Sequence, residues 1–196
     1  MSTSKRPYHH GDLRAALIDA GVALLREVGP AALSLRAAAR TAGVSAMAPY
    51  RHFADKDDLL AGVAAHGFQL FSDALGGAAA AQPDAVHALR AQGVAYVRFA
   101  ISEPALFRLM FGPVIGGPAG LEALKGAGAP AFNQLRAGVA AAIPGLEPKA
   151  AEDFVLACWS IVHGLSCLMV DGKIPPPEDL DGAVERMLCL LLPPNA

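Results

Sequence analysis

The stretch from residue 34 to residue 53, SLRAAARTAGVSAMAPYRHF, constrains the fold of this chain more than any other. A break at Ala42-Gly43-Val44 divides it into two short helical segments. Each segment begins with a residue that can cap a helix N-terminus, Ser34 or Ser45, and the central glycine suits a turn with positive φ. The pattern predicts a helix-turn-helix. Pro49 removes a backbone donor, so we expect the second helix to be kinked or partly 3₁₀.

The composition favours an all-α fold. Hydrophobic residues make up 54% of the 196 residues, raised by alanine and leucine, which are strong helix formers. Alternating β-branched runs are missing. Apolar residues at helical spacing predict helices over residues 12–28, 56–75, 84–102, 105–111, 121–143, 149–170 and 180–191. We expect Gly29-Pro30 to end the first helix, a linker over 76–83, a loop over 112–120, and an interruption of the 121–143 helix at 126–130.

Charge is distributed unevenly along the chain. The part up to Lys56 carries a net charge of +4 and the remainder −6, so only the N-terminal part suits a phosphate backbone. Before the first helix, Lys5 and Arg6 lie in a segment that we expect to be a flexible arm along the backbone or in a minor groove of DNA. The alternative is an ordinary disordered terminus.

The second helix of the helix-turn-helix carries Tyr50, Arg51 and His52 beside small alanines. Its backbone could therefore approach a nucleic-acid groove closely while the longer side chains reach phosphates. Lys56, at the start of the next helix, lies where a phosphate could be clamped. The alternative for Tyr50 and His52 is packing of this helix onto the first. Arg51 is the one residue of a base-reading type clearly placed for a groove, so no operator sequence follows.

The sequence GVSAMAPYRHFADKDDLL resembles the helix-turn-helix signature of the TetR family of transcriptional repressors, and YHHGDLR at the N-terminus is similar to the opening of one branch of that family. The resemblance implies a homodimer whose recognition helices enter successive major grooves of a near-palindromic operator. It makes Ser45, Ala46, Met47 and Tyr50 candidates for base or groove contact. The resemblance also makes Arg36, Tyr50, His52 and Lys56 candidates for phosphate contact.

The helix expected over 149–170 has two apolar stripes, one from Phe154 to Leu168 and one from Val155 to Met169. Such a helix must be covered on two sides, by its own domain and plausibly by a second subunit. The predicted dimer contacts come from this helix and the last one: Val155, Val162, Leu180, Val184, Leu188 and Leu191. Residues 154–170 lack a formal charge but are short for a membrane span, so we expect a buried helix and no membrane partner.

Trp159, His163 and Gly164 resemble the Trp-x-x-x-His-Gly signature of a C-terminal domain found in the same TetR branch. Trp159 and His163 share a helix face, where an indole wall and a switchable donor or acceptor could contact a small molecule. Further apolar lining could come from Phe99, Phe107, Met110, Phe111 and Phe132. The alternative is that these are core residues, with His163 bonded to a nearby carbonyl. The resemblance implies release from DNA by an effector, which we expect to be small and apolar or aromatic.

These observations predict an N-terminal three-helix helix-turn-helix domain, residues 8–56, and a C-terminal helical ligand-binding and dimerisation domain, residues 57–196. We expect a cytoplasmic, ligand-responsive repressor. Cys158, Cys167 and Cys189 suit reduced core residues, with a thiol redox switch as the alternative. No cofactor is predicted, and no metal site, since the adjacent His9-His10 lack a third ligand. A helical enzyme using His163 with Cys167 is the second function class, but no third orienting group is evident.

Overall fold

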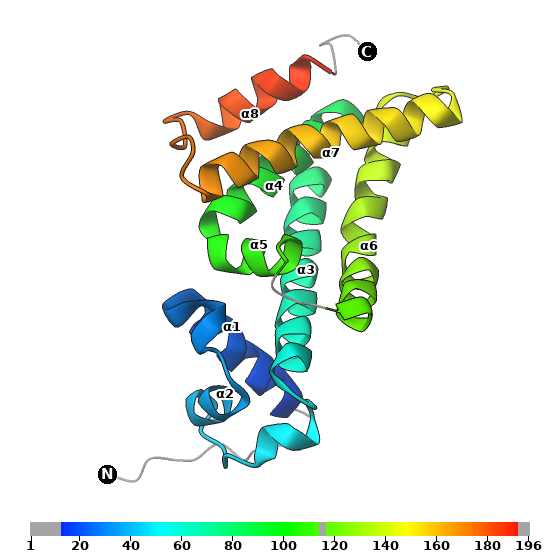
Figure 1. Ribbon diagram of the computed structural model, residues 1–196. Coiled ribbons are helices and arrows are strands. Elements are labelled where there is room, and N and C mark those ends of the chain that lie inside the picture. The colour runs from blue at the N-terminus through cyan, green and yellow to red at the C-terminus, as the bar shows by residue number, and fades with distance from the viewer. Residues whose placement is uncertain (1–12, 114–116, 192–196) are drawn as a thin grey trace.

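The computed structural model describes residues 13–113 and 117–191. Over these ranges it holds eight α-helices, one short 3₁₀ helix and no strand (Figure 1). The predicted all-α fold is confirmed. A small N-terminal unit lies at one end of the molecule, and the longer helices form a second unit that α3 joins to it (Figure 1).

The N-terminal unit consists of α1 (Leu13–Ala32), α2 (Leu35–Thr41), the 3₁₀ helix η1 (Ala48–Arg51) and the first half of α3 (Lys56–Ala80). The predicted break at Gly29-Pro30 is present, since Gly29 has a φ of +74° inside α1. Helices α1 and α3 approach closely at Gly21, where an added Cβ would lie 2.6 Å from a Val63 methyl. The absence of a side chain at this position therefore brings the two helices together.

Helix α3 belongs to both units. Its N-terminus is capped by Asp55, whose carboxylate accepts a hydrogen bond from Asp58 N at 2.9 Å. Leu59 and Val63 pack on α1, whereas Phe68 and Phe71 further along join the core of the second unit. The division predicted at residue 56 therefore falls at the start of a helix that both units share.

The linker predicted over residues 76–83 is wrong in its first part, because α3 continues to Ala80. The alanines at residues 78–80 are strong helix formers and sustain the helix beyond the two glycines. A tertiary contact also supports this end, since a Cβ added at Gly76 would lie 3.7 Å from the Gln134 side chain of α6. The break that follows is short, and Asp84 then caps α4 by accepting from His87 N at 2.9 Å.

The second unit is completed by α4 (Ala85–Ser102), α5 (Pro104–Phe111), α6 (Gly117–Ala142), α7 (Pro148–Val170) and α8 (Leu180–Cys189). Helix α6 lies alongside α3, and α7 crosses the end of both, with α8 beyond it (Figure 1). Helix α4 contacts α3, α5, α6, α7 and α8 and is the centre of this unit.

Helix α6 differs from its prediction in two respects. It begins at Gly117, inside the stretch expected to be a loop, and it runs without interruption through residues 126–130 with Pro130 inside it. A tertiary contact lies at the expected interruption, because a Cβ added at Gly128 would meet the Phe68 ring at 3.2 Å. The small residue lets α6 lie against α3, and the alanine-rich sequence on either side favours helix. Gly145, with a φ of +84°, follows its end.

Helix α7 is buried along one stripe only. Its Val155, Cys158, Val162, Ser166 and Met169 are buried against the rest of the chain. On another face, the side chains of Leu156 and Leu168 are 55% and 46% exposed. Among the described helices, α7 is the one long and apolar enough to cross a bilayer, and 28% of that apolar window is buried. Its packing on α4, α6 and α8 makes it a helix of the second unit, partly uncovered within one chain.

Candidate nucleic-acid interface and internal cavity

The turn between α2 and η1 is formed as the capping pattern indicates. Ser34 Oγ accepts a hydrogen bond from Ala37 N at 3.1 Å and caps α2. Gly43 follows α2 with a φ of +70°, a conformation that is strained for a residue with a side chain. Both features were predicted from residue type. They fix the direction in which the chain leaves α2.

The second helix of the motif is the 3₁₀ helix η1, as Pro49 indicates. Pro49 occupies its first turn and is buried. The predicted N-cap at Ser45 is wrong, because η1 begins after Met47 and no side chain caps it. Ser45 contributes its backbone carbonyl instead, which accepts from Ala48 N at 3.0 Å. A proline has no N–H to continue an α-helical ladder, so the segment takes a tighter turn.

Most of the candidate DNA-contacting side chains lie at the surface of the N-terminal unit. Met47 is 70% exposed and Tyr50 is 45% exposed, although both are large hydrophobic residues. Arg51 is exposed beside them on η1, and Phe53, 1% exposed, anchors the segment in the core. The other exposed candidates are Arg36, Ser45 and Ala46.

Two of the candidates are partly held by the protein. His52 is half-buried, at the C-terminal cap of η1. The Lys56 ammonium donates to the Ala31 carbonyl oxygen at 3.0 Å, so it joins α3 to the end of α1. A lysine has three donors, which leaves it able to bind a phosphate as well. Lys5 and Arg6 lie outside the described residues.

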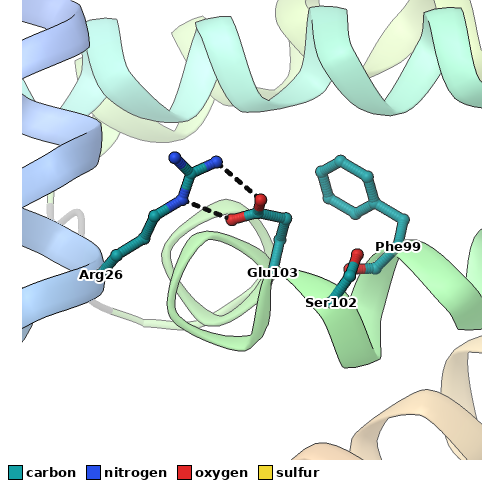
Figure 2. Close-up of polar contacts among 4 residues, drawn as sticks. All are labelled: Arg26, Phe99, Ser102 and Glu103. Atoms are coloured by element: carbon teal, nitrogen blue, oxygen red, sulfur yellow. Dashed lines mark hydrogen bonds and ion pairs between the residues drawn. The ribbon is translucent and has the colours of Figure 1, made fainter.

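An ion pair links the N-terminal unit to the second unit. Arg26 of α1 reaches Glu103, at the junction of α4 and α5, with two parallel hydrogen bonds (Figure 2). The Glu103 hydrogen bond and charge raise the pKa of the Arg26 guanidinium, despite partial desolvation. Bidentate arginine–carboxylate pairs are more restrictive in geometry than other ion pairs, so this contact orients α1 relative to α5.

The second unit holds a cavity of about 520 Å³, partly open to solvent, between α3, α4, α5, α6, α7 and α8. This volume falls in the range of small-molecule sites. Six aromatic rings line it: Phe68, Phe71, Tyr96, Phe111, Phe132 and Trp159. The aliphatic lining includes Leu75, Leu89, Met110, Leu135, Val162 and Leu188. Polar lining comes from Gln92, Tyr96, Trp159 and the exposed Lys125. The cavity is therefore an apolar site with few polar groups.

Tyr96 of α4 contributes a hydroxyl that has two side-chain hydrogen-bond partners. Its hydroxyl lies 2.8 Å from His163 Nδ1 and accepts from Trp159 Nε1 at 3.3 Å. On the other side of the imidazole, Cys167 Sγ lies 3.5 Å from Nε2. Burial lowers the pKa of His163 and raises the pKa of Tyr96, so both groups are uncharged near neutral pH. Trp159, Tyr96, His163 and Cys167 thus form a neutral hydrogen-bonded chain of four side chains.

The candidate ligand-binding residues divide into two groups. Met110, Phe111, Phe132 and Trp159 line the cavity, whereas Phe99, Phe107 and His163 do not. Phe99 packs edge-on against Phe71, with ring centroids 5.2 Å apart. The His163 ring packs against the Phe107 ring, with centroids 5.6 Å apart, and hydrogen-bonds to the hydroxyl of the lining residue Tyr96. The expected carbonyl partner of His163 is replaced by this tyrosine hydroxyl.

Sequence reasoning missed three important lining residues, Phe68, Phe71 and Tyr96. The two phenylalanines lie in the second half of α3, which falls within the predicted ligand-binding domain but supplied no candidate lining residue. Tyr96 was recognised only as part of the apolar pattern of α4. Its buried hydroxyl, which requires a partner, was the signal that could have indicated it.

Four of the six predicted dimer residues lie in the core of one subunit. Val155, Val162, Val184 and Leu188 are nearly or fully buried, and Val162 with Leu188 lines the cavity. These side chains cannot meet a second subunit, so their assignment as dimer contacts is wrong. The helical pattern alone did not separate the inner stripe of α7 from the outer one. Leu180 and Leu191 are half-buried.

The cysteines are free thiols, with Cys158 buried and Cys167 and Cys189 half-buried. Burial raises the pKa of the Cys158 thiol to about 11, and burial with the nearby Asp171 carboxylate raises the pKa of Cys167. Raised pKa values disfavour the reactive thiolate. The raised pKa values suit the interpretation of these cysteines as reduced core residues, and they disfavour a thiol redox switch at Cys158 and Cys167.

Comparison with protein-family models shows the family to which this chain belongs. Residues 17–63 match the model of bacterial regulatory proteins of the tetR family. Residues 89–191, more than half of the chain, match the C-terminal domain of tetracyclin repressor-like proteins. The chain belongs to the TetR family. The resemblance in the sequence is thereby confirmed.

Solved structures of similar fold agree with the TetR assignment. A protein of unknown function from Rhodococcus sp. RHA1 is 31% identical, with a TM-score of 0.80 and coverage of 95% of this chain and 97% of that one. A TetR/AcrR family regulator from Thermobifida fusca is 19% identical, with a TM-score of 0.68 and coverage of 94% and 99%. FadR from Bacillus subtilis in complex with stearoyl-CoA is 16% identical, with a TM-score of 0.73 and coverage of 91% and 97%. No curated protein sequence matches the chain.

TetR-family proteins are ligand-responsive DNA-binding transcription regulators and not enzymes. This TetR-family chain is accordingly a transcription regulator, and the helical-enzyme alternative built on His163 and Cys167 is rejected. The raised pKa of Cys167 and the lowered pKa of His163 also describe an uncharged pair instead of an activated nucleophile and base.

Proposed function

We propose that this TetR-family regulator is a cytoplasmic repressor that binds a near-palindromic operator as a homodimer and is released by a small apolar or aromatic effector. The observation that carries the proposal is the exposed surface of α2, the turn and η1, where Met47, Tyr50 and Arg51 project from a segment anchored by Phe53. A rigid backbone with exposed long side chains suits insertion into a major groove.

The phosphate contacts that we propose surround this segment. Arg36 is exposed on α2, and Lys56 lies at the start of α3. These cations, with the net charge of +4 up to Lys56, would position the unit on the DNA backbone. Base contacts would then come from Ser45, Ala46, Met47 and Tyr50, with Arg51 as the candidate reader of a guanine.

The uncovered face of α7 supports a dimer. Leu156, Ser160, Gly164 and Leu168 are exposed and follow one another at intervals of four residues, so they form a continuous ridge. A Cβ at Gly164 would meet no other atom within 4 Å. A glycine inside a helix costs about 1 kcal/mol relative to alanine, and no contact within the subunit accounts for it. Close approach of the same helix from a second subunit would use this position, and Leu190 of α8, 84% exposed, extends the apolar surface.

A route from the cavity to the DNA-binding unit runs through α5. Met110 and Phe111, at the C-terminal end of this eight-residue helix, line the cavity. Glu103 precedes its N-terminus and holds Arg26 of α1. An effector that displaces Phe111 would move α5 and, through this ion pair, α1. The separation of the two DNA-binding units in a dimer would then change.

The decisive test is selection of operators from random DNA by the purified protein, followed by gel shift on the selected sequence. We expect a near-palindromic site, binding by two subunits, and affinity that falls steeply with salt. Tyr50→Ala combined with Lys56→Ala should abolish binding, whereas Arg136→Ala on α6 should not. In transcription assays, the bound protein should lower transcript levels. Failure to enrich any sequence at low salt would contradict the proposal.

A further inference from the structure

We infer that the cavity accepts an uncharged, ring-containing molecule with one hydroxyl or carbonyl oxygen, and that this oxygen hydrogen-bonds to Tyr96. The inference rests on the proposed role of the cavity as the effector site and specifies its ligand. Three properties of the cavity carry it: the nature of its walls, the charges around it, and the hydrogen bonds that the Tyr96 hydroxyl already makes.

The walls favour rings. Aromatic side chains from α3, α4, α5, α6 and α7 surround the cavity. Several already meet edge to face, such as Phe71 with Tyr96 at 4.8 Å and Phe132 with Trp159 at 5.6 Å between centroids. A flat apolar ligand extends this arrangement, because aromatic pairs gain energy beyond the area that they bury.

The charges around the cavity disfavour cations. Among the described lining residues there is no Asp or Glu, and the charged one is Lys125, whose side chain is exposed. An ammonium group inside the cavity would lose its hydration without a carboxylate to replace it. Burial keeps His163 and Tyr96 uncharged as well. An anionic group would likewise lose its hydration, because none of the buried lining residues is a cation, so the interior suits a ligand that carries no formal charge.

The Tyr96 hydroxyl has one hydrogen-bonding position left in either tautomer of His163. If His163 carries its proton on Nε2, near Cys167 Sγ, Tyr96 donates to Nδ1 and accepts from Trp159. One lone pair then remains for a donor such as a ligand hydroxyl. If the proton is on Nδ1, His163 and Trp159 both donate to the Tyr96 oxygen, and the Tyr96 proton is free for a ligand carbonyl. The Tyr96 hydroxyl can therefore bind either a ligand hydroxyl or a ligand carbonyl oxygen.

His163 is a positioning residue in this arrangement. It does not line the cavity itself, but its Nδ1 hydrogen-bonds to the hydroxyl of Tyr96, which is a lining residue. Trp159 fixes the same hydroxyl from the same helix, four residues earlier. Two bonds from α7 to one atom of α4 restrict the rotation of the hydroxyl, and this pre-organisation lowers the entropic cost of binding a ligand oxygen.

Four matched probes test the inference: biphenyl, 4-hydroxybiphenyl, 4-acetylbiphenyl and 4-(aminomethyl)biphenyl. Trp159 is the single tryptophan of the chain and lines the cavity, so its fluorescence reports binding in the full-length protein without DNA. We expect the two oxygen-bearing probes to bind up to about tenfold more tightly than biphenyl, which corresponds to one hydrogen bond of up to about 1.4 kcal/mol. The aminomethyl cation should bind more weakly than biphenyl.

Tyr96→Phe retains the ring and removes the hydroxyl. It should bring the affinity for 4-hydroxybiphenyl down to that for biphenyl and leave biphenyl binding unchanged. Ser102→Ala is the control, because it removes a hydroxyl that donates to the Phe99 carbonyl oxygen at 3.1 Å and that does not line the cavity, so the preference should persist. Thermal unfolding followed by circular dichroism verifies that both variants fold.

The inference is overturned by equal affinities of biphenyl and 4-hydroxybiphenyl, by a preference that survives Tyr96→Phe, by tighter binding of the cation, or by no binding of 4-hydroxybiphenyl at its solubility limit. Operator release is assayed separately. A Tyr96-dependent preference without release would support the ligand class and contradict effector control of DNA binding. Normal operator binding without the preference would contradict the ligand class alone.

Discussion

Arg26 and Glu103, 77 positions apart in the sequence, form a bidentate ion pair in which Arg26 Nε and Nη2 donate to the two carboxylate oxygens at 2.8 and 2.6 Å. The pair joins α1 of the DNA-binding unit to the start of α5, whose other end lines the cavity (Figure 2). Local sequence features do not indicate this contact, and it is the most direct polar link between the two units in the described part of the chain.

Glu103→Gln should weaken the coupling between effector and operator. The ion pair is partly exposed, so its loss should lower the free energy of unfolding by at most about 1 kcal/mol. We expect unchanged effector affinity by Trp159 fluorescence but a reduced ability of the effector to release DNA, measured by fluorescence anisotropy of a labelled operator. Asp181→Asn is the control, because it breaks the Arg98–Asp181 pair between α4 and α8 within the second unit. A larger loss of coupling in Asp181→Asn would contradict this role for Glu103.

Arg36→Ala should weaken DNA binding to specific and random sequences alike. Arg36 is exposed on α2, so its removal should not unfold the protein. If it contacts one phosphate, the slope of log affinity against log salt should decrease by about 1 for each subunit bound. Binding isotherms between low and physiological salt measure this slope. Arg136→Ala should leave the slope unchanged, and an unchanged slope in Arg36→Ala would remove this residue from the interface.

Leu168→Lys should shift the protein from dimer to monomer. Leu168 lies on the exposed ridge of α7 beside Gly164, and a buried, unpaired ammonium would oppose association of the two ridges. Sedimentation velocity over a range of concentrations measures the effect, and operator binding should weaken with it. Leu70→Lys places the same charge at a similarly exposed leucine on α3 and should leave the dimer intact. Dissociation by Leu70→Lys instead would place the interface on α3.

Protonation of His163 should make stability depend on pH. Burial lowers its pKa in the folded state below the ordinary value of 6.5, so the unfolded chain binds a proton more readily. Stability should therefore be fully present above about pH 6.5 and decrease as the pH falls below this value towards the folded pKa. Urea unfolding at several pH values measures it. His163→Gln should lose this component of the pH dependence. An identical pH dependence in both proteins would contradict the assignment.

The DNA-binding unit could be predicted closely because its signals are local. Ser34 and Asp55 cap helices through side chains that bond three residues ahead, and Gly43 adopts a positive φ that few other residues tolerate. The 3₁₀ geometry of η1 follows from Pro49 in the same way. The Ser45 cap failed because its expected place depended on an α-helix that the proline prevents.

The sequence by itself determined the helical class, the caps at Ser34 and Asp55, the turn and the family, because each depends on residue types at short, fixed spacing. The tertiary structure alone decided which face of α7 is inward, so that Val155 and Val162 belong to the core and Leu156 and Leu168 to the surface. It also decided that α3 supplies the cavity and that Tyr96 meets His163, 67 positions away. Apolar periodicity shows that a helix has a buried face, but the partner of that face depends on how distant helices pack.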